Sequence, residues 1–203
     1  MIVERLVCAS ANPDKVREIE RILGGVAVLS PRPASVDEVV EDAGSLVGNA
    51  RLKASAIRDA TGRAAVADDT GLFVDALPGE LGVETAHYAS DRSDFDSDPY
   101  GSNRRKLLEA LTTAGCLDER SRRAEFVTVV LVAWPDGRET IVEGRCAGHV
   151  AFDERGARGW GFDPLFVPDD GDGRTFAEMT DEEKHRLSHR GRAFDELARV
   201  LGR

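Results

Sequence analysis

The sequence is poor in residues that cross-link a chain or anchor it in a bilayer. Its 203 residues include only three cysteines, Cys8, Cys116 and Cys146, which lie far apart. They predict neither a disulfide framework nor a zinc site, and they favour a reducing, cytoplasmic compartment. No apolar run approaches the ~20 residues that span a bilayer. The N-terminus also lacks the basic and apolar regions of a signal peptide, so we expect no membrane partner.

The sequence also has fewer basic than acidic residues. Lysine and arginine number 27 against 37 acidic residues, which leaves a net charge of −10. This balance argues against a broad basic face for nucleic acid, although a few local cations could still hold a small phosphate ligand. Hydrophobic residues at 41% and charged residues at 32% are typical of a soluble globular protein. The length predicts one domain, residues 1–203, with room for two lobes.

Several strong functional motifs are missing. The sequence has no GxxxxGK[ST] loop, HExxH, GxSxG or CxxC. The run Gly159-Trp160-Gly161 continues as Phe162-Asp163-Pro164, which is not a dinucleotide-binding glycine turn. The chemistry must therefore be sought in less familiar patterns.

Expected strands and helices alternate, which predicts an α/β fold. Asn12-Pro13 indicates a helix start, Ser45 a helix cap, and Thr180 with Glu183 a capping box on one last helix. The expected strands are 2–9, 26–29, 64–67 and the hairpin strands 125–134 and 138–142 around Asp136-Gly137. The expected helices are 13–23, 45–62, 103–114 and one from 180 onward, and 77–99 is expected to be a long functional loop.

Two patterns suggest phosphate and metal chemistry. Ser10 to Lys15 lies between a strand and a helix N-terminus, where free N–H groups and the helix dipole favour an anion. Taken alone, simple capping by Asn12 is the commoner explanation. Asp68-Asp69-Thr70-Gly71 follows a strand, and paired carboxylates suit Mg²⁺ or the orientation of a water. The alternative is an acidic turn closed by Gly71.

Other patterns are weaker alone. Glu41-Asp42 is most often a solvated loop, and Asn49 with Lys53 shares one helix face. Trp160 and Phe162 could stack on a purine, but core packing explains Phe162 better. Lys184, Ser188, His189 and Arg190 could line a base site or form a solvated helix surface. Together these signals suggest two cation sites for phosphate, a carboxylate pair and an aromatic, basic site for a base.

Three separated stretches resemble one known family, the inosine triphosphate pyrophosphatases or non-canonical purine NTP pyrophosphatases. The resemblance covers essentially the whole chain. Its most specific parts are 66–72 (VADDTGL), 161–168 (GFDPLFVP) and the run from 175 to 191, which contains TFAEM, EEK and SHRG.

The resemblance implies an elongated α/β fold of two lobes, with a central mixed β-sheet flanked by helices and a cleft between the lobes. It also implies a homodimer and Mg²⁺-dependent hydrolysis of ITP, dITP and XTP to the monophosphate and pyrophosphate. The reaction fits the observed residue types, because attack at phosphorus depends on positioning and on electrostatic stabilisation.

The resemblance also implies roles for individual residues. The triphosphate would be held by Ser10, Ala11, Asn12, Pro13, Asp14 and Lys15, with Lys53 and Thr70. Glu41 and Asp69 would bind the metal, Asp68 would support it, and Asp69 would act as general base; the metal carboxylate could instead be Asp42. The base would be held by Trp160, Gly161, Phe162, Asp163, Lys184, His189 and Arg190.

Some positions depart from the family pattern. Ala11 and Asp14 stand where the family has glycine, Gly48 where it has a carboxylate, and His87 where it has arginine. These departures bear on rate and substrate, and they keep a nucleotide-binding protein of low turnover open as an alternative. For the base, Arg190 has only donors and His189 can donate, which favours a 6-oxo purine over adenine.

Overall fold

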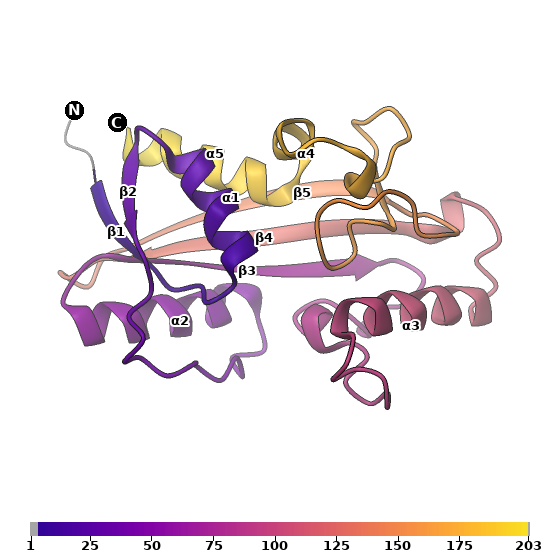
Figure 1. Ribbon diagram of the computed structural model, residues 1–203, viewed down its shortest axis with the longest axis horizontal. Coiled ribbons are helices and arrows are strands. Elements are labelled where there is room, and N and C mark those ends of the chain that lie inside the picture. Colours follow the sequence, from indigo (N-terminus) through magenta and orange to yellow (C-terminus); the bar gives the residue numbers. More distant parts are fainter. Residues whose placement is uncertain (1–3, 203) are drawn as a thin grey trace. The chain divides into compact units, whose positions relative to one another are not determined.

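The computed structural model describes residues 4–202, and its elements alternate as an α/β fold (Figure 1). The expectation for residues 2 and 3 lies outside this range. The strands are β1 (Glu4–Cys8), β2 (Ala27–Ser30), β3 (Ala65–Val74), β4 (Arg123–Ala133), β5 (Glu139–Val150) and β6 (Phe166–Pro168). The helices are α1 (Pro13–Leu23), α2 (Leu46–Thr61), α3 (Pro99–Thr113), α4 (Asp181–Leu187) and α5 (His189–Leu201), with short 3₁₀ turns at Thr85–His87, Arg120–Arg122 and Phe176–Glu178.

Within residues 4–202 the strands form one mixed sheet in the order β2-β1-β3-β4-β5-β6. β1 runs parallel to β2 and to β3, and β5 is antiparallel to β6. The pairing of Val7 with Ala65 and of Cys8 with Val66 sets the register of β1 on β3. This register matters for function, because it decides which residues follow the two strands at the same edge of the sheet.

The chain divides into two compact units, and the divisions fall inside β3, β4, β5 and the first turn of α5. The first unit comprises residues 1–69, 128–144 and 190–203. In it, α1 and α5 lie on one side of the strands and α2 on the other (Figure 1). Its core joins apolar residues of these elements: Leu6, Ile19, Leu23, Val130, Val132, Phe194 and Leu197 are members.

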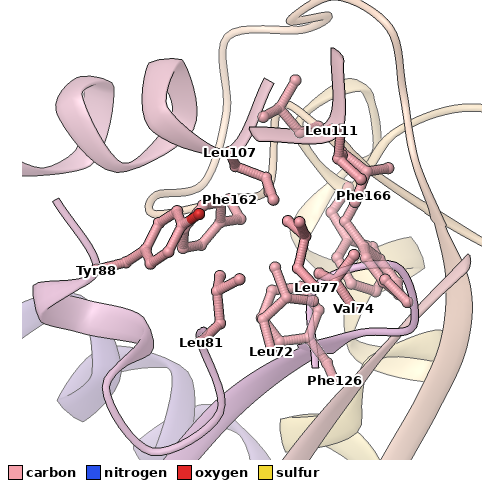
Figure 2. Packing of buried hydrophobic residues seen from close by; sticks show 14 of the residues in the cluster. Leu72, Val74, Leu77, Leu81, Tyr88, Leu107, Leu111, Phe126, Phe162 and Phe166 are labelled. Carbon is pink, nitrogen blue, oxygen red and sulfur yellow. The ribbon is translucent and has the colours of Figure 1, made fainter. Parts of the chain in front are cut away.

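The second unit comprises residues 70–127 and 145–189. Its core is richer in aromatic side chains, and Figure 2 shows Phe126, Phe162 and Phe166 packed with leucines of β3, of the loop that follows it and of α3. Phe126 meets Phe166 edge to face at 4.8 Å between ring centroids. Aromatic pairs in this geometry add about 0.5–1.5 kcal/mol beyond the area they bury.

The local capping predictions are confirmed. Asn12 accepts a hydrogen bond from the backbone N–H of Lys15 at the start of α1. Ser45 caps α2, which ends at Gly62. Thr180 and Glu183 form the expected capping box at the start of α4. Each cap links residues within four positions, so the sequence alone can predict it.

Three expectations about the elements are corrected. Asp68 to Gly71 is not a turn, because β3 continues to Val74 and bridges Gly82 through Leu72. The last helix is two helices, because Ser188 is extended, with φ −73° and ψ 153°, between α4 and α5. The third long helix begins at Pro99 rather than Asn103, because Asp98 caps it by accepting from the N–H of Gly101.

Candidate functional site

The register of β1 on β3 brings the two phosphate and metal signals together. The N–H of Ala9, the residue after β1, donates to the carbonyl of Val66 on β3 at 2.8 Å. Because β1 ends at Cys8 whereas β3 continues to Val74, the chain that leaves β1 passes beside Asp68 on β3. The start of α1, with Lys15 on its first turn, therefore lies beside Asp68.

Asp68 is the buried centre of this edge. Its Oδ2 accepts from Nη2 and Nε of Arg190 at 3.2 and 3.3 Å, and it lies 3.5 Å from Nζ of Lys15. Burial opposes ionisation of Asp68, but the cations Lys15 and Arg190 outweigh it and hold the pKa of Asp68 far below its usual value. Its Oδ1 is buried and has no hydrogen-bond partner within residues 4–202. Asp68 is therefore a fixed anion with one unused acceptor.

Arg190 lies among carboxylates of the first unit. Besides Asp68, its guanidinium donates through Nη1 to Oε2 of Glu18 on α1, at 3.2 Å, and Arg190 is only 1% exposed. The expectation that Arg190 reads the 6-oxo group of a base is thus not what these contacts show, and that role stays a prediction. Sequence reasoning missed Glu18; its place three residues after Lys15, on the same face of α1, was the available signal.

A second group of charges surrounds Asp69. Nζ of Lys53 donates to Oδ1 of Asp69 and to Oε2 of Glu41, both at 2.9 Å. Burial lowers the pKa of Lys53, but the nearby carboxylates, Asp69 first, outweigh it and raise that pKa, so Lys53 stays charged. Burial raises the pKa of Asp69 to about 6, and the negative charge of Glu41 adds to this against the pull of Lys53.

Asn49 connects this group to the loop that carries Glu41. Its Nδ2 donates to Oδ2 of Asp69 at 3.3 Å, and its Oδ1 accepts from the N–H of Ala43 at 3.1 Å. The next residue back, Gly48, leaves room for the loop: a Cβ there would lie 2.6 Å from Cβ of Ala43. The missing carboxylate at position 48 is thus explained by this close approach. The pairing of Asn49 with Lys53 on one helix face was visible in the sequence, but the partners of Asn49 were not.

These residues fit a divalent cation. Glu41 and Asp69 share the ammonium of Lys53, an arrangement in which two neighbouring carboxylates gain from a shared cation. The unused Oδ1 of Asp68 is a further buried oxygen. Among the described residues no group of three or more potential ligands is assembled. Mg²⁺ does not require one, because it commonly takes one or two carboxylates, waters and substrate phosphates.

The remaining predicted phosphate residues flank this cluster. Ser10 accepts from the N–H of Asn12 at 3.2 Å, so both shape the connection from β1 to α1. Pro13 begins α1, and Ala11 precedes it as an exposed residue. The side chain of Asp14 lies outside the described part of the structure. Thr70 follows Asp69 directly in β3.

The second unit holds the predicted base-binding residues around Asp163. Oδ2 of Asp163 accepts from the N–H of Trp160 and from Nζ of Lys184, both at 2.8 Å. Gly159 has φ +71°, and a Cβ there would collide with this carboxylate. Nζ of Lys184 lies 5.9 Å from the centre of the Trp160 ring and 5.8 Å from that of Phe176. The turn 159–163 and α4 therefore present an indole and a buried ammonium together.

Two other predicted base residues lie deeper. Phe162 is only 5% exposed and belongs to the core, as the alternative interpretation expected. His189 is 3% exposed and stacks on Phe126, with ring centroids 4.4 Å apart and an interplanar angle of 18°. Gly161 accepts through its carbonyl from Nη1 of Arg104 on α3, a residue that the sequence did not single out.

Comparisons with known proteins identify one family over nearly the whole chain. The model of the Ham1 family matches residues 6–200. A dITP/XTP pyrophosphatase of Rhodospirillum centenum is 41% identical over 96% of this chain and 93% of its own length. A dITP/XTP pyrophosphatase of Deinococcus deserti is 42% identical over 95% of this chain and 87% of its own length. A HAM1 protein from Coxiella burnetii superposes with a TM-score of 0.85 at 33% identity, covering 98% of this chain and 99% of its own.

Proposed function

The chain belongs to the Ham1 family and is a nucleoside triphosphate hydrolase, and we propose that it hydrolyses non-canonical purine triphosphates such as dITP, XTP and ITP between the α and β phosphates. The products are the nucleoside monophosphate and pyrophosphate. The observation that carries the proposal is the ammonium of Lys53 held between the carboxylates of Glu41 and Asp69, beside Asp68 and Lys15. Cations for phosphate and oxygens for a metal occur there in one cluster.

Each residue of the cluster has a distinct role in the proposal. Lys15 and Lys53 bind the β and γ phosphates, and Glu41 and Asp69 hold Mg²⁺ with Asp68 as support. When bound, Mg²⁺ neutralises charge on the phosphates and acidifies a coordinated water. Asp69 accepts the proton of the attacking water as general base, and its raised pKa suits that task. Arg190 and Glu18 keep Asp68 ionised and oriented.

The base is read, in this proposal, by Trp160, Asp163, Lys184 and His189. Trp160 supplies a stacking surface, and Lys184 supplies donors that suit a 6-oxo group. The 6-amino group of adenine would face those donors, and an unpaired buried polar group costs about 1–3 kcal/mol. ATP should therefore be a poorer substrate than ITP or XTP by roughly tenfold to a hundredfold.

The decisive experiment offers purified protein a panel of ITP, dITP, XTP, GTP and ATP with Mg²⁺ and measures pyrophosphate and orthophosphate separately. We expect pyrophosphate, with ITP and XTP ahead of ATP. Orthophosphate with a diphosphate product would reject the bond assignment. Tight binding of ITP without turnover would instead identify a nucleotide-binding protein of low turnover, the alternative that Asp14, Gly48 and His87 raise.

The proposal also includes a homodimer that works in the cytoplasm on a small-molecule substrate. Its support is the family resemblance, the net charge of −10 and three cysteines that are free and buried. In the described range, no helix is both long and apolar enough to span a membrane. Light scattering coupled to size-exclusion chromatography tests the dimer, which would elute at twice the mass of one chain.

A further inference from the structure

We propose that Tyr100 and Arg104, on the first half of α3, are positioning residues that brace the turn 159–163 and thereby set the selectivity for the base. The inference rests on the proposed role of Trp160 in base binding and deepens it. Neither residue belongs to the stretches that carried the family resemblance. The two residues are four positions apart on α3 and therefore lie on one face of that helix.

Tyr100 is the aromatic half of the brace. Its ring centre lies 6.0 Å from that of Trp160, with the planes inclined by 40°. Tyr100 is 40% exposed and is not a member of the buried core of this unit. Aromatic pairs prefer offset or tilted geometries at this separation. The contact therefore restrains the Trp160 ring without tying Tyr100 into the folding of the unit.

Arg104 is the polar half of the brace. Its Nη1 donates to the carbonyl of Gly161 at 2.9 Å, and its Nε lies 2.9 Å from Oε2 of Glu154. Arg104 thus connects α3 to the turn itself and to the loop that leads into it. A charged donor on a carbonyl makes a stronger bond than a neutral one, and the carboxylate of Glu154 orients it.

The turn is held from its other side by Asp163, which accepts from the N–H of Trp160 and from Lys184. Asp163 fixes the backbone at the start of the turn through its bond to the N–H of Trp160. The ring of Tyr100 packs against the indole ring of Trp160 as an aromatic neighbour in the second unit. Loss of the brace should loosen the ring and weaken stacking on a base.

The neighbouring face of α3 provides a matched control. Arg105, the next residue, pairs with Asp94 and Asp98 of the preceding loop rather than with the turn. Arg105→Ala removes a guanidinium from the same helix and breaks comparable ion pairs. Arg105→Ala should leave Trp160 and Gly161 undisturbed, whereas Arg104→Ala should loosen both.

The experiment uses the full chain with Trp134→Phe, which leaves Trp160 as the one tryptophan, since the sequence has two. Binding of IMP is followed by the fluorescence of Trp160, and binding of pyrophosphate alone by calorimetry. We expect Tyr100→Ala to shift the emission and to weaken IMP binding about threefold to tenfold. Arg104→Ala should do the same, and Tyr100→Phe and Arg105→Ala should match the parent. Pyrophosphate binding should be equal in all variants.

Steady-state kinetics provides the second readout. For Tyr100→Ala and Arg104→Ala, KM for ITP should rise by the same factor as the IMP affinity falls, while kcat stays within about twofold, because the brace acts on binding of the base. The ratio of kcat/KM for ITP to kcat/KM for ATP should decrease in both variants. Unchanged emission and IMP affinity in both variants, or an equal effect of Arg105→Ala, would overturn the brace. If the fluorescence of Trp160 in the parent does not change when IMP binds, although the protein turns over ITP, Trp160 does not take part in base binding. The inference would then be wrong even though the proposed activity stands.

Discussion

Asp69 is the residue on which the proposed chemistry depends most. It joins three partners at once: Lys53, the amide of Asn49 and the carboxyl group of Glu41. Neighbouring Asp68 has an opposite character, because Arg190 and Lys15 keep it ionised. Two adjacent carboxylates thus differ in acidity through their surroundings alone, which is the usual way a protein separates a fixed anion from a proton acceptor.

Replacing Asp69 with Asn keeps the shape of the side chain and removes its charge and basicity. We expect turnover to fall roughly a hundredfold or more, because a positioned base contributes about 10²–10⁴-fold and metal binding suffers as well. Circular dichroism should show an intact fold. Asp75→Asn, at an exposed position one residue beyond β3, serves as the control and should stay near wild type. Near-normal turnover of the Asp69 variant would remove it from the role of base.

The raised pKa of Asp69 also predicts a pH dependence of stability. The folded protein holds this proton up to pH about 6, whereas the unfolded chain releases it near ~3.9. Between these values Asp69 binds more protons in the folded state, so the contribution of Asp69 to the free energy of unfolding should fall as pH rises through that window. The pKa of Glu41 is lowered, so Glu41 contributes only at the acid end. Urea unfolding at several pH values, without added metal, measures the slope.

Asp69→Asn should flatten that slope between pH about 5 and 6.5, because the variant has no group to titrate there. In metal-free infrared titrations, the difference between the wild type and this variant should contain a carboxyl group that titrates at pH about 6. Stabilities of the wild type and the variant that change in parallel through the window would contradict the raised pKa of Asp69.

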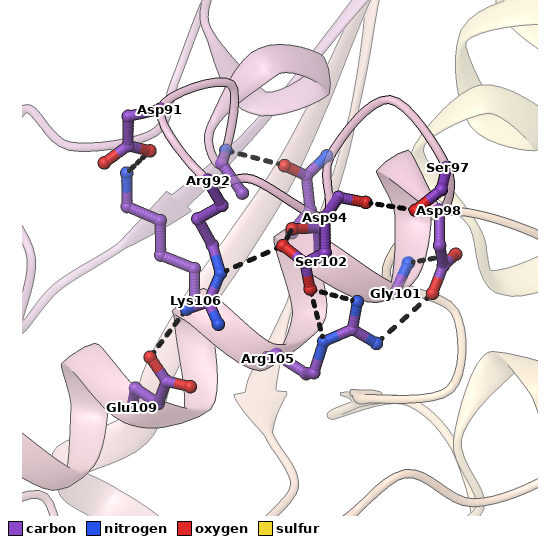
Figure 3. Close-up of polar contacts among 12 residues, drawn as sticks. Asp91, Arg92, Asp94, Ser97, Asp98, Gly101, Ser102, Arg105, Lys106 and Glu109 are labelled. Carbon is purple, nitrogen blue, oxygen red and sulfur yellow. Dashed lines mark hydrogen bonds and ion pairs between the residues drawn. The ribbon is translucent and has the colours of Figure 1, made fainter.

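Among the elements, α3 organises its surroundings on two faces. One face carries Tyr100 and Arg104 toward the turn 159–163. The other holds the loop before the helix, and Figure 3 shows Asp94 at the centre of its bonds. Asp94 accepts from Ser102 at 2.6 Å and from Nη2 of Arg105 at 2.7 Å. A segment rich in aspartate is thus ordered by residues of the helix that follows it.

Asp94→Asn should loosen this loop. The side-chain bond to Ser102 and the ion pair with Arg105 lower the pKa of Asp94, so its contribution to stability is present at neutral pH and is lost as pH falls. We expect faster hydrogen exchange across residues 89–98 and a small decrease in Tm, since exposed ion pairs contribute little. In about 1 M salt the difference should shrink, because charges are screened.

The exposed neighbour Asp96 provides the comparison for this experiment. Asp96→Asn removes the same charge from the same loop and should leave both exchange and Tm unchanged. Equal effects of the two variants would mean that the net charge of the loop, rather than the bonds of Asp94, controls its order.

In the whole molecule, two cores share three strands. The core around Leu107 belongs to the second unit and the core around Leu197 to the first, while β3, β4 and β5 each run through both. The backbone of each of these strands passes directly from one core into the other, so disorder that begins in one unit reaches a strand of the other. The two units should therefore unfold in one cooperative transition.

Leu107→Ala and Leu197→Ala test this expectation, because both side chains are fully buried. Each should destabilise the protein by about 2–5 kcal/mol. Calorimetry should show a single transition that moves to lower temperature in both variants. Two separate transitions, each sensitive to only one substitution, would show that the cores unfold independently.

Local interactions and the family resemblance made much of this protein predictable from its sequence. The caps at Asn12, Ser45 and Thr180 depend on partners within four residues, and apolar periodicity placed α1 and α2 correctly. The α/β class followed from the alternation of elements. The family followed from motifs that run through the chain in order, and the comparisons confirm it.

Tertiary structure decided where the chemistry gathers. β3 continues through Asp68 and Asp69 because Gly82, ten residues beyond Leu72, supplies the bridge. The guanidinium of Arg190 meets Asp68 across 122 residues of chain, and Lys53 joins Glu41 to Asp69. Such contacts cannot be predicted from hydrophobic periodicity or from residues close by in the sequence. A buried charge is oriented by whichever opposite charge the fold brings within reach.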